Sequence, residues 1–163
     1  MAAPLMIAAL MAGPLSRAAE RPEKVSDFSL KNIEGKTVSL NDFRGKRMLI
    51  NFWATWCGPC LDEMTVLRQV QDQWREKGLV VLLINMGESA SRVRGYVRRY
   101  ALSFPVLLDP NTELFVKLGV RMLPTSLLVD RDGTIVARKE GAFLSTENLE
   151  KEFIIPVFGK GKP

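Results

Sequence analysis

The feature that most constrains the fold is an abrupt change of hydrophobic pattern around residue 57. Residues 48–53 form a nearly continuous apolar run, which is typical of a strand buried on both faces of a sheet. Beyond the run, apolar residues recur at the spacing of one helical face: Leu61, Met64, Leu67, Val70 and Trp74. The only two cysteines, Cys57 and Cys60, stand at the junction. The pattern predicts a buried strand that turns directly into a helix, with both thiols at the helix N-terminus.

The rest of the chain predicts an α/β domain whose mixed central sheet is flanked by helices on both faces. Residues 28–40 alternate around Glu34-Gly35-Lys36 and predict an N-terminal β-hairpin. Further strands are expected over residues 79–85, 104–108, 126–129 and 134–137, the last two joined by an Asp-Arg-Asp-Gly turn. Further helices are expected over residues 93–100, 109–118 and 145–153. The short segment 104–108 is interpreted as an edge strand.

The composition excludes several classes of function. None of the 163 residues is a histidine, which removes histidine general bases, Cys-His nucleophile pairs, haem ligation by histidine and most zinc chemistry. The net charge of +5 comes from basic residues scattered among acids, so nucleic-acid binding is not predicted. With 47% apolar residues, one domain of this length can bury a core without disulfide staples.

Three roles are open to the two cysteines. A structural zinc site needs four ligands, usually Cys or His, and one copy of this chain offers only Cys57 and Cys60. A disulfide across so short a loop removes little chain entropy, and a chain of this size does not need it. The third role is thiol-disulfide exchange. It fits the position of the pair, because unpaired N–H groups and the helix dipole stabilise a thiolate at a helix N-terminus.

The spacing assigns an order to such an exchange. Cys57 would attack a partner disulfide, and Cys60, one turn later and less exposed, would then attack Cys57 and release the reduced partner. Pro59 suits the first helical turn, where its missing N–H costs nothing. Trp56 adjoins Cys57 and is expected to frame the exposed sulfur, whereas Trp53 is interpreted as a packing residue.

The stretch from Phe52 to Cys60, FWATWCGPC, resembles the active site of the thioredoxin superfamily. Residues 28–44 and the phrase NFWATWC are similar to one branch, the extracytoplasmic reductases of the TlpA and ResA type, close to the AhpC/TSA group. The resemblance covers the chain from about residue 27 to the last helix. It implies a thioredoxin-like fold with an N-terminal β-hairpin lead-in. It also implies protein substrates that contact Trp56, Gly58 and Pro59.

Residues 122–125, Met-Leu-Pro-Thr, resemble the cis-proline loop of the same superfamily. From the residues alone, an ordinary loop proline before a strand fits equally well. The resemblance implies that the Leu123–Pro124 bond is cis, which costs little only before proline. It also implies that the backbone of Leu123 pairs with an incoming peptide like an added strand.

Two positions depart from the patterns of these relatives. Thioredoxins carry a buried aspartate at the place of Asn51, where it helps to move the proton of the second cysteine. Asn cannot take a proton, but Glu63, three residues after Cys60, matches an acid that the ResA-type branch keeps near its disulfide. We predict that Glu63 moves this proton; the alternative is a surface glutamate in the first helical turn. Thr65 replaces a proline that often kinks this helix in the branch, so a straighter helix is expected.

The resemblance implies a reductase, because Gly58-Pro59 is the dipeptide of thioredoxin and is typical of reducing members. The expected substrates are protein disulfides, with apocytochrome c first and a copper-site assembly protein of cytochrome c oxidase second. A membrane thiol electron donor is expected to reduce the disulfide back to the dithiol, because a reductant becomes oxidised in an oxidising compartment. No metal is expected, and no cofactor beyond the redox-active disulfide Cys57–Cys60.

Two other functions stay open. Peroxiredoxins share the lead-in strands, but their peroxide-attacking cysteine has a threonine three residues earlier, where this chain has Ala54. A Cu(I) carrier for oxidase assembly would look much the same, because paired thiolates suit a soft ion and Met64 or Met122 could add a thioether.

The N-terminus predicts export. Residues 5–15 form an apolar run of the length of a secretory h-region, and Ser16 and Ala18 fit the small-x-small cleavage rule. No Lys or Arg precedes the run, so a disordered apolar tail is the alternative. The expected division is a signal-like segment (1–18), a linker (19–26), a thioredoxin-like domain (27–158) and a tail (159–163). A periplasmic or other extracytoplasmic location follows.

N-terminal sequencing of the mature protein from its native cells tests the export prediction. Cleavage after Ala18 gives a chain that begins at Ala19, because the residues at the last and third-last positions before the cut are both small. A mature chain that begins at Met1 or Ala2 would contradict the prediction.

Overall fold

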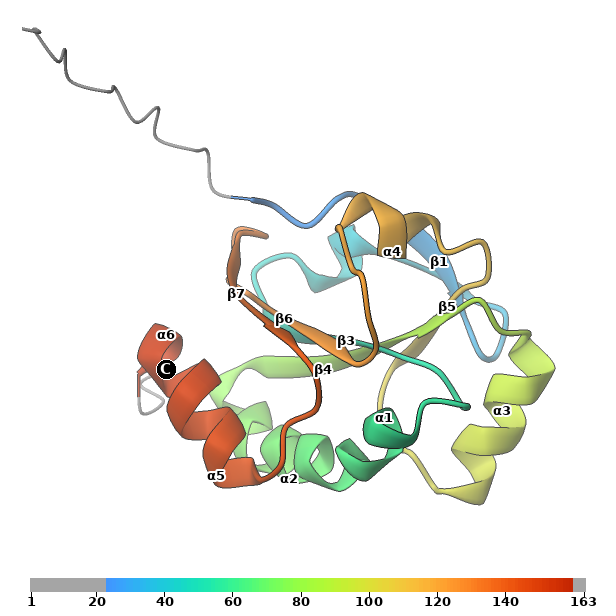
Figure 1. Cartoon of the computed structure of the whole chain (residues 1–163). Helices are drawn as coiled ribbons and strands as arrows, with labels where there is room; N and C mark the ends of the chain where they lie inside the picture. Colours follow the sequence, from blue (N-terminus) through green and yellow to red (C-terminus); the bar gives the residue numbers. More distant parts are fainter. Residues whose placement is uncertain (1–22, 160–163) are drawn as a thin grey trace, which may run out of the picture.

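The computed structural model describes residues 23–159, which form a seven-stranded sheet covered by helices (Figure 1). The strands are β1 (Ser29–Asn32), β2 (Thr37–Ser39), β3 (Arg47–Trp53), β4 (Leu79–Met86), β5 (Val106–Asp109), β6 (Thr125–Val129) and β7 (Ile135–Glu140). The α-helices are α1 (Gly58–Asp62), α2 (Met64–Trp74), α3 (Ala90–Arg99), α4 (Glu113–Lys117), α5 (Thr146–Leu149) and α6 (Ile155–Phe158). Short 3₁₀ turns follow β2 (Leu40–Phe43) and α2 (Arg75–Lys77), and a π-helical turn (Glu150–Ile154) joins α5 to α6.

The sheet is mixed, as the sequence predicts, and its strand order is β2-β1-β5-β4-β3-β6-β7. The three central strands β5, β4 and β3 are parallel, whereas β6, β7 and the β1–β2 hairpin pair antiparallel to their neighbours. Strand β3 lies between β4 and β6 and is buried along almost its whole length. It therefore reads as an apolar run rather than as an alternating strand.

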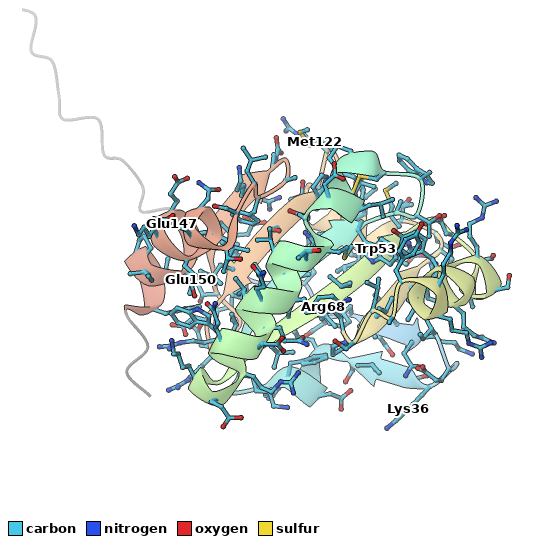
Figure 2. The ribbon with its side chains drawn as sticks, turned by 90° about the horizontal axis from the view of Figure 1, so that it is seen from below. Lys36, Trp53, Arg68, Met122, Glu147 and Glu150 are labelled. Carbon is cyan, nitrogen blue, oxygen red and sulfur yellow. A yellow bond between two sulfur atoms is a disulfide. The ribbon has the colours of Figure 1, made fainter. Side chains whose placement is uncertain are left out.

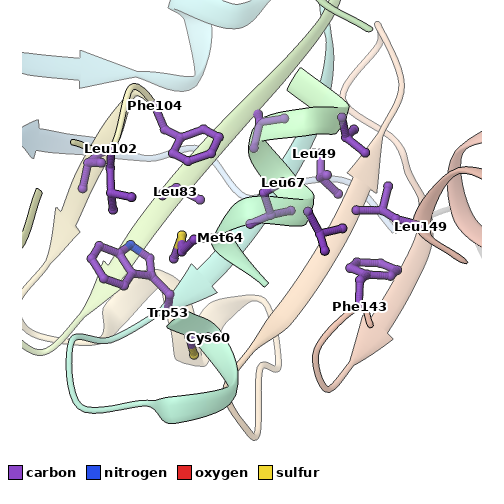
Figure 3. Close-up of a cluster of buried hydrophobic side chains, with 14 of the residues drawn as sticks. Leu49, Trp53, Cys60, Met64, Leu67, Leu83, Leu102, Phe104, Phe143 and Leu149 are labelled. Atoms are coloured by element: carbon purple, nitrogen blue, oxygen red, sulfur yellow. The ribbon is translucent and has the colours of Figure 1, made fainter. Parts of the chain in front are cut away.

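Two hydrophobic clusters fill the two sides of the sheet. Figure 1 shows α1, α2, α3, α5 and α6 on one side and α4 on the other. The first cluster joins Leu49 and Trp53 of β3 to Leu67 of α2 and Leu149 of α5, with Cys60 at its margin (Figure 3). The second joins the opposite face of β3 to Leu114 of α4. The apolar side chains of β3 thus enter one core or the other, up to the last residue of the strand, Trp53.

Three expectations about local structure need correction or extension. Segment 106–109 is an interior strand, because the β1–β2 hairpin pairs with it and displaces it from the sheet edge. The first helix is not a straight continuous helix: it is interrupted at Glu63, which has φ −81° and ψ −8° and separates α1 from α2. The last helix extends to Phe158 through the π-helical turn.

The expected signal-like segment (1–18) and residues 160–163 of the expected tail lie outside the described residues. Residues 23–26 of the expected linker run beside the start of β7, where Lys24 forms a bridge with Thr134 and Val25 is buried. Over residues 23–159, no helix combines the length and apolar character needed to cross a bilayer.

Substitution of Leu67 tests whether the packing of α2 on the sheet sustains the domain. Leu67 is 0% exposed, and Leu67→Ala should lower the free energy of unfolding by about 2–5 kcal/mol, because it leaves a cavity under the helix. The matched control is Leu144→Ala, which removes the same atoms from a side chain that is 90% exposed and should change stability by at most about 0.5 kcal/mol. Urea denaturation measures both, and equal losses would contradict this view of the core.

Candidate active site

The two cysteines lie at the start of α1, where the buried strand β3 has just ended. Cys57 is the N-cap of the helix, and the backbone N–H of Cys60 donates to its sulfur at 3.3 Å. The two residues form a disulfide. Cys57 is 5% exposed and Cys60 is fully buried, so the first sulfur is the one nearer to solvent. This matches the order of attack that the sequence predicts.

The surface around Cys57 is apolar and comes from two loops. Trp56 is 63% exposed, and Gly58 and Pro59 are exposed beside it. The second loop precedes β6, and the register pair Phe52–Thr125 places it beside the end of β3. In Figure 2, Met122 lies at the same end of the molecule as the yellow sulfur atoms of the disulfide.

The second loop contains the expected cis bond. The peptide bond between Leu123 and Pro124 is cis, Pro124 is buried and Leu123 is half-buried. The hydroxyl of Thr125 donates to the carbonyl of Met122 at 2.8 Å and closes the loop. The predicted substrate-contacting residues therefore lie at the start of α1, on the loop before it and on the cis-proline loop, all at this end of the sheet.

Glu63 is buried at the C-terminal end of α1, three residues after Cys60, rather than exposed on the helix surface. Its side chain is 0% exposed, and it accepts hydrogen bonds from Asn51 Nδ2 at 2.7 Å and from the backbone N–H of Phe143 at 2.9 Å. Asn51 Nδ2 also donates to Ser126 Oγ at 3.0 Å. The alternative of a surface glutamate is thus wrong, and Asn51, which cannot take a proton, orients a residue that can.

Burial raises the pKa of Glu63 to about 7, from the 4.5 of an exposed glutamate, although the N–H of Phe143, the amide of Asn51 and the charge of Lys139 act to lower it. Desolvation outweighs the hydrogen bonds because a buried carboxylate loses its hydration. The group therefore changes its protonation state near neutral pH, which is the range in which a general acid or base is useful.

A second buried acid, which sequence reasoning missed, holds the loop that leads into Cys57. Glu88 accepts from the backbone N–H of Thr55 at 2.7 Å, from its hydroxyl at 2.6 Å and from Asn85 Nδ2 at 2.8 Å. Glu88 follows β4 closely, so it meets the end of β3 across the parallel pair. The signal in the sequence was polar Asn85 and Glu88 at the end of an otherwise apolar strand.

The thioethers considered for a copper site lie in different surroundings. Met64 is buried in the core cluster with Trp53, whereas Met122 is 47% exposed on the cis-proline loop. Among residues 23–159, no group of three or more His, Cys, Asp or Glu side chains is arranged to hold a metal ion.

Comparison with known proteins decides the family. The model of the AhpC/TSA family matches residues 22–138. The chain belongs to the AhpC/TSA family. It is 36% identical over 129 residues to the thiol-disulfide oxidoreductase ResA of Bacillus thuringiensis subsp. konkukian, covering 79% of this chain and 74% of that protein. This AhpC/TSA protein is accordingly a thiol-disulfide oxidoreductase.

Solved structures agree with the thioredoxin-like fold of this AhpC/TSA chain. A thiol:disulfide interchange protein of Chlorobium tepidum superposes with a TM-score of 0.70 at 29% identity, covering 82% of this chain and 94% of that one. The exposed lipoprotein thioredoxin of Streptococcus pneumoniae gives a TM-score of 0.68 at 28% identity, with coverage of 78% and 97%. The fold class and the redox class predicted from the sequence are both confirmed.

The buried carboxyl of Glu63 predicts an unusual dependence of stability on pH in the oxidised protein. The stability that Glu63 contributes is fully present below about pH 4.5, because both states are then protonated. It is lost as the pH rises through about 7, because the unfolded chain releases the proton first. The difference between the two pKa values corresponds to about 3 kcal/mol.

Chemical denaturation of wild type and Glu63→Gln between pH 4 and 8.5 measures this effect. The wild type should lose stability relative to the variant as the pH rises, since Gln carries no proton to lose. Asp62→Asn removes the neighbouring exposed carboxylate and controls for the loss of one charge. Parallel curves for wild type and Glu63→Gln would show that Glu63 is not buried as described.

Proposed function

We propose that this protein is an exported reductase of protein disulfides that works through the Cys57–Cys60 dithiol. The observation that carries the proposal is the position of the pair: Cys57 caps α1 close to the surface, and Cys60 lies fully buried one turn behind it. The sulfur of Cys57 can thus contact the substrate, whereas the sulfur of Cys60 can contact only that of Cys57. This is the geometry that sequential thiol-disulfide exchange needs.

In the first step, the Cys57 thiolate attacks one sulfur of the substrate disulfide. A new S–S bond joins Cys57 to the substrate, and the other substrate sulfur leaves as a thiolate that takes a proton. The N–H groups at the start of α1, among them that of Cys60, stabilise the attacking thiolate. Trp56 and the cis-proline loop would hold the substrate, with the backbone of Leu123 pairing to its chain.

In the second step, Cys60 attacks Cys57, and the substrate leaves with both sulfurs reduced. Cys60 must first lose its proton, and the Glu63 carboxylate, one turn further along the helix, is the group that we propose as its acceptor. The net reaction converts one dithiol and one disulfide into one disulfide and one dithiol. A membrane thiol donor would then return the Cys57–Cys60 disulfide to the dithiol.

The proposal also assigns a compartment and partner proteins. The signal-like pattern of residues 5–18 favours export, and one structural relative is named as an exposed lipoprotein. Apocytochrome c would be the first substrate candidate, because its haem-attachment thiols must be reduced. A copper-site assembly protein of cytochrome c oxidase is the second candidate.

Trapping in the native cells tests the reaction and the substrate together. In Cys60→Ala, Cys57 can still attack but cannot be released, so a mixed disulfide with the substrate should accumulate and be identified by mass spectrometry after purification under non-reducing conditions. The matched control is Cys57→Ala, which should retain almost no adduct because the buried Cys60 meets no substrate.

The identity of the trapped adduct distinguishes a specific pathway, a general reductase and a copper carrier. A cytochrome or an oxidase-assembly protein supports the specific pathway, and many unrelated adducts would indicate a general reductase. If no adduct forms while the reduced wild type binds Cu(I) tightly at one ion per chain, the copper-carrier function replaces the present proposal.

A further inference from the structure

A row of polar residues crosses three strands directly beneath Glu63. Asn51 of β3 is paired in register with Ser126 of β6, and Ser126 is paired with Lys139 of β7. Paired residues of antiparallel strands project from the same face of a sheet. That face carries Glu63, because Asn51 donates to both Glu63 and Ser126. Lys139 thus ends the row on which the Glu63 carboxyl rests.

The side chain of Lys139 lies toward the site. It is half-buried, and its Nζ is 5.4 Å from the centre of the Phe143 ring. The backbone N–H of the same Phe143 donates to Glu63 Oε2 at 2.9 Å. The ammonium group therefore stands next to the residue that closes the far side of the carboxyl pocket, and the charge of Lys139 acts on Glu63.

The charge that acts on the pKa of Glu63 is that of Lys139, and its hydrogen-bond partners are neutral. These partners are the amide of Asn51 on β3, which also donates to Ser126 on β6, and the backbone N–H of Phe143, whose ring packs against that of Phe153. Helix α1 presents the two cysteines, which are neutral while they form a disulfide. In the part of the chain that the structure describes, Lys139 takes part in no ion pair within 4.0 Å, so its charge is not neutralised by a carboxylate partner.

We propose that Lys139 is a positioning residue of the exchange site, which stabilises the ionised carboxyl of Glu63 from β7 and thereby sets the pH at which Glu63 can take the proton of Cys60. The proposal rests on the proposed function, because it assigns a partner to the proton acceptor of the second step. Burial and Lys139 act in opposite directions on the same carboxyl. Burial keeps the proton on Glu63 at low pH, and Lys139 lets it leave near neutral pH.

Carboxyl-selective NMR of the oxidised protein measures the effect directly, because the disulfide does not titrate. With ¹³C-labelled glutamate, the Glu63 resonance is assigned by its absence in Glu63→Gln, and its midpoint is followed with pH. Lys139→Met should raise the midpoint by about half a unit to one unit, which is less than for a direct ion pair. Lys139→Arg keeps the charge and should return the midpoint to the wild-type value. Lys139→Gln provides a second neutral side chain if the methionine variant is unstable.

The matched control is Lys36→Met. Lys36 is an exposed lysine in the β1–β2 turn, at the opposite end of the molecule from Met122 in the view of Figure 2. The Lys36→Met substitution removes the same charge as Lys139→Met. It should leave the titration midpoint of Glu63 within about 0.2 pH units of wild type, because charges separated by more than about 10 Å in solution are largely screened.

Exchange kinetics supply the second measurement. When the reduced protein reacts with the aromatic disulfide DTNB, Cys57 releases the first thiolate and Cys60 releases the second, and the second rate reports proton loss from Cys60. Its pH profile should move upward in Lys139→Met by the same amount as the Glu63 midpoint. A merely structural role would change the rate without moving the profile.

Two results would overturn the proposal. An unchanged Glu63 midpoint in Lys139→Met would show that the lysine does not act on the carboxyl. A midpoint that moves while the exchange profile stays would show that the lysine acts on Glu63 but not on the exchange. Neither result touches the reaction of Cys57, because adduct formation in Cys60→Ala tests that step independently.

Discussion

The burial of one carboxyl group, that of Glu63, holds the parts of the active site together. Its two oxygens accept from Asn51 on β3 and from the backbone of Phe143 after β7, so a helix, a central strand and a distant turn meet at one side chain. A carboxylate at such a place is costly unless its hydrogen bonds are satisfied. The cost appears as a raised pKa of Glu63, and this group, which can exchange protons near neutral pH, follows Cys60 by three residues at the end of α1.

A second buried carboxyl, that of Glu88, holds the loop that precedes Cys57. Glu88 holds both the backbone and the hydroxyl of Thr55, two residues before Cys57. The loop that presents Trp56 is thus fixed from below while its apolar side chain stays exposed. Order in the loop reduces the entropy lost when a substrate docks. The two buried acids thus have different roles in the proposed mechanism: Glu88 fixes the loop, and Glu63 accepts the proton of Cys60.

The sequence predicted the fold well because the hydrophobic pattern changes period at clear positions. The buried runs of β3 and β4, the Asp-Arg-Asp-Gly turn and the helical spacing of α2 need no tertiary information. The interior position of β5 in the sheet could not be predicted, because it depends on the tertiary pairing of the β1–β2 hairpin with this strand. Cys57, Cys60 and the cis-proline loop were predicted because each belongs to a local motif. Glu88 and Lys139 were not predicted, because the residue on which each acts, Thr55 or Glu63, is more than 30 positions away in the sequence.

Thioredoxins carry their buried acid on the strand, at the place of Asn51, whereas this chain carries it on the helix as Glu63. This difference explains why both Asn51 and Lys139 are important for the state of the Glu63 carboxyl in the proposed mechanism. An acid at position 51 would be fixed by the strand, but Glu63 occupies the point where the helix is interrupted, with ψ of −8°. Its carboxyl accepts from the amide of Asn51 on β3, and the same row continues with the hydroxyl of Ser126 on β6, which accepts from that amide, and with Lys139 on β7. Because side chains alternate between the two faces of a strand, a one-residue shift in the register of β7 would turn Lys139 to the opposite face. In the proposed mechanism, proton transfer from Cys60 thus depends on the pairing of an edge strand that carries none of the reacting atoms.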